Sequence, residues 1–359
     1  MRALTPCRFA FLGGRRGLEN RIIPERGMEY HRTLMPSLRD PESQLSLVAA
    51  ALALPIAIVQ ALVVLLRTRA QVVLTSGGLV SLPVVLAATV RRVPIVIWNG
   101  DAVPGRVNRL LARLAKRVAS TFPEEERYFA KNKVVVTGNP IRAELLQWTR
   151  ASGREALDLP QDARVVLIGG GSQGSQLING AVDAALSRLL ASAYVVHLTG
   201  EAFFSRAQAR RTSMLPPERR ERYRPYAFLN EPMGAALAAA DLMVGRAGSG
   251  TIAEALAVGL PLVLVPFGVA ASGHQLANAH SVVDAGAAVM LRESELDGDR
   301  LAAEVVGLLG NQERLARMRA AAARAGRPDA ALRIANLVLE VAQPKAIVRE
   351  QRPMAEKRP

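Results

Sequence analysis

The sequence contains very little cysteine. Cys7 is the only cysteine among 359 residues, so the chain cannot form an intrachain disulfide or a site with several thiolate metal ligands. Disulfide frameworks are typical of secreted proteins, whereas an isolated thiol fits a reducing compartment. The first residues also lack the charged and then apolar pattern of a signal peptide. We therefore expect a protein of the cytoplasm.

Aromatic and acidic residues are scarce as well. Aromatics make up 4% of the chain, and 31 acidic against 46 basic residues give a formal net charge of +15. This excess suggests nucleic acid, an anionic membrane surface or an anionic substrate as a partner. The chain has no zinc knuckle, aromatic RNA-binding strand or concentrated basic helix, so we favour membrane and phosphate groups. Arginine used for solubility would explain part of the excess.

Charge is also absent from one long apolar stretch, Leu45–Leu66. The stretch is about long enough to cross a bilayer, but Pro55 interrupts it. We therefore predict two consecutive helices, Leu45–Ala53 and Ile56–Arg67. Two interpretations stay open: a helix pair buried in the protein, and an apolar patch that touches lipid. Arg67 and Arg69 follow the stretch and could meet anionic headgroups.

Short β-branched runs alternate with longer amphipathic runs, which predicts a doubly wound parallel sheet. In the first half the expected strands are Phe9–Leu12, Val72–Thr75, Pro94–Trp98, Val118–Ser120 and Val134–Thr137. In the second half they are Val165–Ile168, Tyr194–Thr199, Leu242–Val244 and Leu262–Val265. Helices are expected between them, for example at Val107–Ala115, Gln176–Leu190, Met233–Ala240 and Thr251–Val258.

A polar stretch at Leu145–Pro160 separates the two series of strands, and the chain is long enough for two cores. We predict an N-terminal domain over residues 1–145 and a C-terminal domain over 146–328. A last helix is expected over 329–344. Residues 345–359 are rich in Pro, Arg and Glu and are expected to be disordered.

The most informative segment is Arg246–Glu254, a turn of small residues that follows an apolar strand and opens a helix. Such a turn offers backbone N–H groups to phosphate, and Glu254 can accept hydrogen bonds from two ribose hydroxyls. The alternative needs no ligand, because Thr251 and Glu254 have the spacing of a capping box. The turn has more glycine than a cap requires, which favours a nucleotide diphosphate.

A second glycine-rich turn, Gly169–Ser175, also follows a strand and opens a helix. It can bind one phosphate through N–H groups and the Ser172 hydroxyl. The acidic residue of a dinucleotide-binding motif is missing, and His197 stands near its place. A tight turn without a ligand is the alternative.

Two further segments are candidates. Pro140 fixes the exit from a strand, so that Arg142 can reach back over the sheet edge. His274 and Gln275 follow a loop of small residues and can recognise sugar hydroxyls. An ordinary surface arginine and an ordinary loop are the alternatives.

Taken in order, these motifs resemble the MurG family within glycosyltransferase family 28, from about Phe9 to Ala342. In the first half the matching segments are Phe11–Glu19, Ser76–Ser81, Ala102–Gly105, Asn108–Leu111 and Thr137–Pro140. In the second half they are Gly170–Gly174, Asn179, Arg246–Gly248, Glu254, His274–Gln275 and Asn278–Ala279. Each match is weak alone, whereas the ordered set is specific.

The resemblance implies an α/β fold of the GT-B type, with two facing Rossmann-like domains, parallel sheets and a C-terminal helix that crosses back to the first domain. The N-terminal domain would receive the lipid acceptor and associate with the membrane, and the C-terminal domain would bind the UDP-sugar. It implies inverting, metal-independent transfer of N-acetylglucosamine from UDP-N-acetylglucosamine to undecaprenyl-diphosphate-linked N-acetylmuramyl pentapeptide. The product would be lipid II, used in peptidoglycan synthesis. The protein would lie on the cytoplasmic face of the cell membrane as a peripheral protein. No nucleic acid, metal or other cofactor is implied.

The resemblance also implies roles for single residues. Leu229 matches a position whose backbone reads uracil, and Glu254 matches the ribose position. The full donor-binding set is Asp101, Arg142, Ser172, Leu229, Ser249, Gly250, Thr251, Glu254, His274 and Gln275. Helix N-termini, Ser172 and Arg142 would stabilise the departing UDP in place of a metal. A general base is needed near the acceptor hydroxyl.

The chain departs from the family pattern at three places. The family loop Gly-Thr-Gly-Gly-His, which carries the histidine usually proposed as base, is absent, and we expect it to be encoded upstream of Met1. The usual Glu-Gln-Asn reads Asn99-Gly-Asp101 after Trp98, which makes Asp101 and Asn99 the candidate catalytic residues. Leu79 stands where the family has tyrosine.

These departures keep two other functions open. One is a related GT-B transferase that acts on another lipid, such as a diacylglycerol or a polyprenyl glycoside. The other is a paralogue that binds a nucleotide sugar without catalysis.

Overall fold

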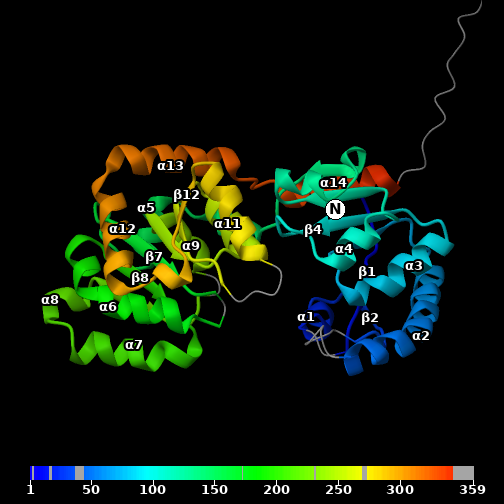
Figure 1. Ribbon diagram of the computed structural model, residues 1–359, viewed down its shortest axis with the longest axis horizontal. Helices are drawn as coiled ribbons and strands as arrows, with labels where there is room; N and C mark the ends of the chain where they lie inside the picture. Colours follow the sequence, from blue (N-terminus) through cyan, green and yellow to red (C-terminus); the bar gives the residue numbers. More distant parts are fainter. Residues whose placement is uncertain are drawn as a thin grey trace, which may run out of the picture.

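The computed structural model describes residues 1, 4–15, 18–36, 44–171, 173–229, 232–268 and 273–342. The predicted phosphate ligand Ser172 and the predicted disordered tail, residues 345–359, lie outside the described residues. Figure 1 shows two domains side by side, one built from the first part of the chain and the other from the later part. The limits of 145 and 328 between domains stay predictions.

The N-terminal domain contains two parallel sheets. β1 (Ala10–Gly13) pairs with β2 (Glu29–Arg32), and a four-stranded sheet has the order β3-β4-β5-β6. The four strands are β3 (Val73–Thr75), β4 (Ile95–Asn99), β5 (Arg117–Ser120) and β6 (Val134–Val136). The α-helices are α1 (Glu19–Glu25), α2 (Gln44–Thr68), α3 (Leu82–Val90) and α4 (Arg106–Leu111). The 3-10 turns are η1 (Leu79–Ser81), η2 (Pro123–Arg127), η3 (Lys131–Lys133) and η4 (Ala143–Gln147).

The C-terminal domain contains one six-stranded parallel sheet in the order β12-β11-β10-β7-β8-β9. Its strands are β7 (Val165–Gly169), β8 (Tyr194–Leu198), β9 (Tyr223–Tyr226), β10 (Leu242–Gly245), β11 (Leu262–Leu264) and β12 (Ala288–Met290). The first helices are α5 (Arg150–Ala156), α6 (Gln176–Ser192), α7 (Glu201–Ser213), α8 (Pro217–Arg220) and α9 (Met233–Ala239). The others are α10 (Ser249–Ala257), α11 (His274–Asp284), η5 (Glu293–Glu295), α12 (Gly298–Gly310) and α13 (Gln312–Ala325).

The strand order of this sheet predicts where a ligand binds. After β7 the chain adds β8 and β9 on one side, then returns to add β10, β11 and β12 on the other. The carboxyl ends of β7 and β10 therefore flank a topological switch point, where open α/β sheets bind ligands. The turns that follow these two strands are the two glycine-rich segments singled out from the sequence.

The last helix, α14 (Ala330–Ala342), lies on the N-terminal domain (Figure 1). Its buried residues Ile334, Leu337 and Val338 pack with Val96 of β4 and Ala119 of β5. The expected crossover helix is confirmed, as is the α/β fold with two parallel-sheet domains.

The expected break at Pro55 is wrong, because α2 is a single helix from Gln44 to Thr68. Proline removes one backbone hydrogen bond and commonly ends a helix. Here small residues on both sides of Pro55 are buried, Ala50 before it and Ala57 and Ala61 after it. Packing of this face, with α3 as the main neighbour, accounts for a helix that continues through the proline.

Candidate active site between the two domains

The turn after β10 ends in a helix N-terminus without a side-chain cap. Gly248 is the N-cap residue of α10, and the first helical hydrogen bond runs from Ile252 N to Gly248 O over 3.0 Å. The N–H groups of Ser249, Gly250 and Thr251 precede that bond in the first turn, where N–H groups have no intrahelical partner. Thr251 lies inside the helix, so the capping-box alternative is wrong.

Glu254, one turn further along α10, forms an ion pair with Arg142, at 3.6 Å between Arg142 Nη2 and Glu254 Oε1. Burial raises the pKa of Glu254, and the nearby Arg142 guanidinium opposes that rise. Arg142 comes from the turn after β6, so the structure brings together two residues that the sequence predicted separately. The pair holds a carboxylate beside the switch point, where it can accept hydroxyl hydrogen bonds.

Residues from α11 connect the two domains. Asn278 donates from Nδ2 to Asp101 Oδ1 (2.9 Å) and to Ala247 O (3.1 Å), and its Oδ1 accepts from Ala102 N (2.8 Å). His274 Nδ1 lies 2.5 Å from Val103 O. Because a carbonyl only accepts, Nδ1 carries the proton of this hydrogen bond. The predicted residues Asp101 and His274 thus meet at one interdomain cluster.

Gln275 and Ser249 lie at the edge of the same region. Gln275 Oε1 accepts from Phe267 N over 3.0 Å, which orients its amide group. Gly100, next to Asp101, lies so close to Ser249 that an added Cβ would be 3.4 Å from Ser249 Oγ. Leu229 is buried after β9, in the C-terminal domain.

Below the cluster, Asn99 belongs to a buried amide network. Asn99 Nδ2 donates to Asp101 O (2.7 Å) and to Glu125 Oε2 (2.8 Å), and Asn99 Oδ1 accepts from Asn108 Nδ2 (3.0 Å). Asn108 Oδ1 in turn accepts from Gly78 N (3.0 Å). Gly77 has φ +85°, and an added Cβ would overlap the Asn108 side chain. The network therefore supports both the Asp101 loop and the loop that begins at Ser76.

This geometry assigns Asn99 a positioning role. Its side-chain polar atoms are all occupied by protein partners and the residue is only 3% exposed, so it cannot contact substrate without breaking the network. Sequence reasoning missed Glu125, because nothing in Pro-Glu-Glu-Glu distinguishes the fully buried glutamate from the two glutamates beside it. Asn108 and Asn278 could be found from the sequence, because both lie in segments that match the family motifs.

We expect Glu125 to make stability depend on pH. Burial raises its pKa to about 8, against the opposing effect of hydrogen bonds from Phe122, Asn99 and Thr121, and Asp101 raises it further. Because the ordinary value is 4.5, the stabilising contribution is complete below that pH and is lost as the pH rises to about 8. The Glu125→Gln substitution should remove this slope, on the order of a few kcal/mol.

Urea unfolding between pH 4.5 and 8.5 measures the effect of Glu125→Gln. The control is Glu126→Gln, which changes an exposed carboxylate in the same turn. An unchanged slope in Glu125→Gln would show that Glu125 is ionised in the folded protein throughout this range.

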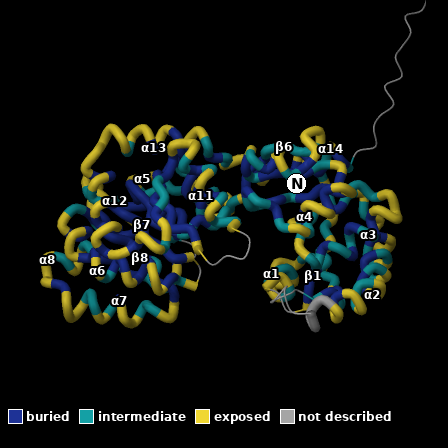
Figure 2. Tube along the Cα trace, viewed as in Figure 1, coloured by how far each residue is buried: buried dark blue, intermediate teal, exposed yellow. Residues whose placement is uncertain are grey.

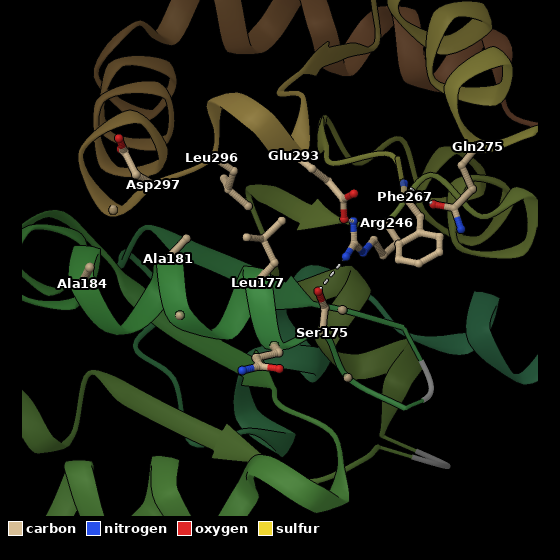
Figure 3. Close-up of a pocket in the computed structure, with 15 residues that line it drawn as sticks. Ser175, Leu177, Ala181, Ala184, Arg246, Phe267, Gln275, Glu293, Leu296 and Asp297 are labelled. Carbon is tan, nitrogen blue, oxygen red and sulfur yellow. Dashed lines mark hydrogen bonds and ion pairs between the residues drawn. The ribbon is translucent and has the colours of Figure 1, made fainter. Parts of the chain in front are cut away.

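A cavity of about 940 Å³ adjoins the switch point between α6 and α12 (Figure 3). Arg246 lies at one end of it. Its guanidinium contacts Glu293 Oε1 at 2.5 Å and Ser175 Oγ at 2.8 Å and lies 5.2 Å from the centre of the Phe267 ring. These contacts tie together the loops that follow β7, β10, β11 and β12. Among the predicted donor residues that the structure describes, Gln275 alone lines the cavity. The cavity therefore lies next to the predicted donor site.

His197 is part of the core. It is 1% exposed, and its ring nitrogens lie 2.9 Å from Tyr223 Oη and 3.0 Å from Asn179 Oδ1. Burial lowers its pKa to about 4. The ring therefore links β8 to β9 and α6 as a neutral group. A buried neutral side chain cannot replace the acidic residue of a dinucleotide-binding motif.

Comparison with known proteins agrees with this architecture. The glycosyltransferase family 28 N-terminal domain matches residues 6–120, and the family 28 C-terminal domain matches residues 165–334. A curated protein of Salinibacter ruber is 40% identical over 349 residues, covering 95% of this chain and 91% of that protein. One of Mycolicibacterium smegmatis is 39% identical over 361 residues, covering 96% and 89%.

Both relatives are named UDP-N-acetylglucosamine–N-acetylmuramyl-(pentapeptide) pyrophosphoryl-undecaprenol N-acetylglucosamine transferase. Among solved structures, Acinetobacter baumannii MurG is similar with a TM-score of 0.74 and 25% identity, covering 94% of this chain and 93% of that one. The two family domains together span most of the chain, and the curated relatives exceed a third identity over nearly all of it. The chain therefore belongs to the MurG branch of glycosyltransferase family 28.

Proposed function

We propose that this chain transfers N-acetylglucosamine from UDP-N-acetylglucosamine to undecaprenyl-diphosphate-linked N-acetylmuramyl pentapeptide and so forms lipid II. The observation that carries the proposal is the contact of Asn278 with Asp101 and Ala247. It joins the turn at the switch point to the N-terminal loop that bears the candidate base. A donor held by one domain would therefore lie beside an acceptor held by the other.

On the donor side, each part of UDP-N-acetylglucosamine has a candidate partner. The diphosphate would lie at the first turn of α10, against the N–H groups of Ser249, Gly250 and Thr251. Ser172 and Arg142 would add further stabilisation to the departing UDP. Glu254 would accept from the ribose hydroxyls, the Leu229 backbone would read uracil, and His274 and Gln275 would bind sugar hydroxyls. This arrangement stabilises the leaving group through N–H dipoles and needs no metal.

On the acceptor side, the muramyl hydroxyl would attack the anomeric carbon and release UDP with inversion. Asp101 is the proposed base, because it is a partly exposed carboxylate at the interdomain cluster and Asn278 orients it. Asn99 fixes the same loop from below through Asp101 O. The proton of the hydroxyl would pass to Asp101 as the C–O bond forms.

Glu254→Ala is expected to weaken binding of UDP on the order of 100-fold, because two hydrogen bonds to a charged group are lost. The dissociation constant for UDP by calorimetry measures the effect. Glu155→Ala, which removes an exposed glutamate of the same domain, should bind UDP like the parent. Equal affinity of Glu254→Ala and the parent would remove Glu254 from the donor site.

We further propose that the N-terminal domain binds the cytoplasmic face of the cell membrane as a peripheral protein. α2 is long and apolar enough to span a bilayer by length and composition, yet one of its faces is packed inside the domain. The opposite face carries exposed apolar residues at helical spacing: Val48, Leu52, Ile56, Val59, Val63 and Leu66. Exposed and less exposed positions recur along α2 in Figure 2. An apolar stripe of this kind fits insertion at a lipid interface.

Leu52→Gln should lower the affinity for phosphatidylglycerol vesicles roughly tenfold, because one side chain no longer enters the acyl region. Vesicle sedimentation measures this affinity. Met214→Gln is the matched control, since Met214 is 71% exposed and Leu52 is 73% exposed. Equal losses in the two variants would contradict insertion through α2.

An acceptor panel tests the function as a whole. UDP release from UDP-N-acetylglucosamine should depend on the muramyl pentapeptide lipid, with diacylglycerol and polyprenyl glycoside inactive. Turnover with diacylglycerol alone would favour the related lipid transferase, which the departures from the family pattern at Leu79, Asn99 and Asp101 suggest. Donor binding without turnover on any acceptor would favour the non-catalytic paralogue.

A further inference from the structure

Glu125 is a buried carboxyl group that faces hydrogen-bond donors on both of its oxygens. It is 0% exposed. Its Oε1 accepts from Thr121 N (2.8 Å) and Phe122 N (2.9 Å), and its Oε2 accepts from Asn99 Nδ2 (2.8 Å). A carboxyl group can accept on both oxygens whether or not it carries a proton, whereas a side-chain amide accepts on its oxygen alone. The site therefore selects a carboxyl group over an amide of the same shape.

The bond from Asn99 connects Glu125 to the loop of the proposed base. Asn99 Nδ2 has two hydrogens, of which one goes to Glu125 Oε2 and the other to Asp101 O. On the other side, Asn99 Oδ1 accepts from Asn108 Nδ2. Rotating this amide by half a turn would set its oxygen against Asp101 O and its nitrogen against a donor. Glu125 and Asp101 O together thus give the Asn99 amide one orientation.

A second connection runs between the same two segments. Thr121 Oγ1 donates to Asn99 O over 2.9 Å, while Thr121 N donates to Glu125. The end of β4 is therefore held to the start of η2 through its backbone as well as its side chain. The chain leaves this point directly into Gly100 and Asp101, so any shift of Asn99 is passed to the carboxylate of Asp101.

We infer that Glu125 is a positioning residue for Asp101 and acts through the side-chain amide of Asn99. The inference rests on the proposed function for the role of Asp101 as base. It also gives a reason for one departure from the family pattern. That pattern has glutamate where this chain has Asn99, so here the carboxyl group lies on η2 and the amide on β4. The two groups should be exchangeable only as a pair.

The test is a double-mutant cycle of the parent, Glu125→Gln, Asn99→Asp and the double variant. In Glu125→Gln the new nitrogen must face a donor, either Asn99 Nδ2 or the N–H groups of Thr121 and Phe122. In Asn99→Asp an oxygen replaces Nδ2 and faces both Glu125 Oε2 and Asp101 O. In the double variant the amide at position 125 donates to the carboxylate at position 99 and accepts from the backbone. Only the bond to Asp101 O is then lost.

Each single variant should lower kcat for the muramyl lipid roughly 10–100-fold, with the dissociation constant of UDP changed by about twofold or less. The double variant should be about tenfold or more faster than either single variant, because the partners match again. Glu126→Gln, which changes an exposed glutamate of η2, is the control and should keep the parent kcat.

Hydrogen–deuterium exchange of residues 99–103 gives a second readout that needs no acceptor. Exchange should be faster in both single variants and return toward the parent in the double variant. This readout holds even if the parent transfers no sugar to the muramyl lipid, so failure of the proposed function is distinguished from failure of the inference.

Three results would overturn the positioning role of Glu125. The first is a parent-like kcat in Glu125→Gln. The second is a double variant whose loss of kcat is the product of the two single losses, because the side chains would then act independently. The third is a loss of UDP affinity that parallels the loss of kcat in the single variants, which would make the network a general support of the fold.

Discussion

Replacing Asp101 by Asn is expected to lower kcat by about 10²–10⁴-fold, with the dissociation constant of UDP-N-acetylglucosamine changed by about threefold or less. The reason lies in the contacts of the carboxylate. Asp101 Oδ1 accepts from Asn278 Nδ2, and the amide oxygen of asparagine can accept the same hydrogen bond. The interdomain cluster therefore keeps its geometry, while the group that accepts the acceptor proton is lost.

Single-turnover kinetics with the muramyl lipid separate chemistry from binding in this variant. Asp284→Asn is the matched control, because it changes an exposed aspartate at the end of α11. If Asp101→Asn keeps a third or more of the parent rate, Asp101 is not the base. A proportional rise in the donor dissociation constant would instead make Asp101 a donor-binding residue.

Asp241→Ala is expected to destabilise the C-terminal domain by about 3–5 kcal/mol, because it leaves a buried charge without its partner. Asp241 Oδ2 accepts from Arg154 Nη2 (3.1 Å) and from Val165 N (2.9 Å), at the start of β7. Arg154 is 0% exposed, and burial lowers its pKa. Arg150 contacts the other carboxylate oxygen at 2.6 Å. One carboxylate therefore joins α5 to the central strand of the sheet.

Urea unfolding followed by tryptophan fluorescence measures this loss of stability. Asp158→Asn is the control, since the side chain of Asp158 is 92% exposed and pairs with Arg224 at the surface, and asparagine tolerates the left-handed backbone of this position (φ +53°). Surface pairs contribute about 0–1 kcal/mol, so this control should stay close to the parent. Similar losses in both variants would contradict a special role for the buried pair.

The sequence predicted most central strands well, because parallel strands buried on both faces are continuous apolar runs. Val165–Ile168 is such a run and forms β7 almost residue for residue. β9 was missed because Tyr-Arg-Pro-Tyr has polar residues and a proline. That composition is compatible with an edge strand, and β9 is at the edge of the sheet.

The prediction at Pro55 failed for a different reason. A local rule says that proline ends a helix, but burial of Ala50 and Ala57 on either side of it is a tertiary effect. The capping-box alternative failed in the same way. Glu254 has the right spacing, yet its partner is Arg142, more than a hundred residues earlier in the chain.

Residue identities suggested the candidate site, and the fold supplied its geometry. Asp101 and His274 could be named from the motifs, but no spacing rule could predict that Asn278 and Val103 would be their partners. Asn99 could be named from the motifs too. Only its burial beside Glu125 shows that it positions a loop and does not contact the substrate. Contacts between residues far apart in the chain are the part of a site that a single sequence does not predict.

Analysis of the reaction product tests the central claim most directly. The chain is incubated with UDP-N-acetylglucosamine and the muramyl pentapeptide lipid in the presence of a chelator, and the lipid is examined by mass spectrometry and NMR. The account predicts one added N-acetylhexosamine, joined by a β-linkage from the α-linked donor, with one UDP released for each sugar transferred. An α-linked product, or UDP release that yields only free sugar, would contradict it.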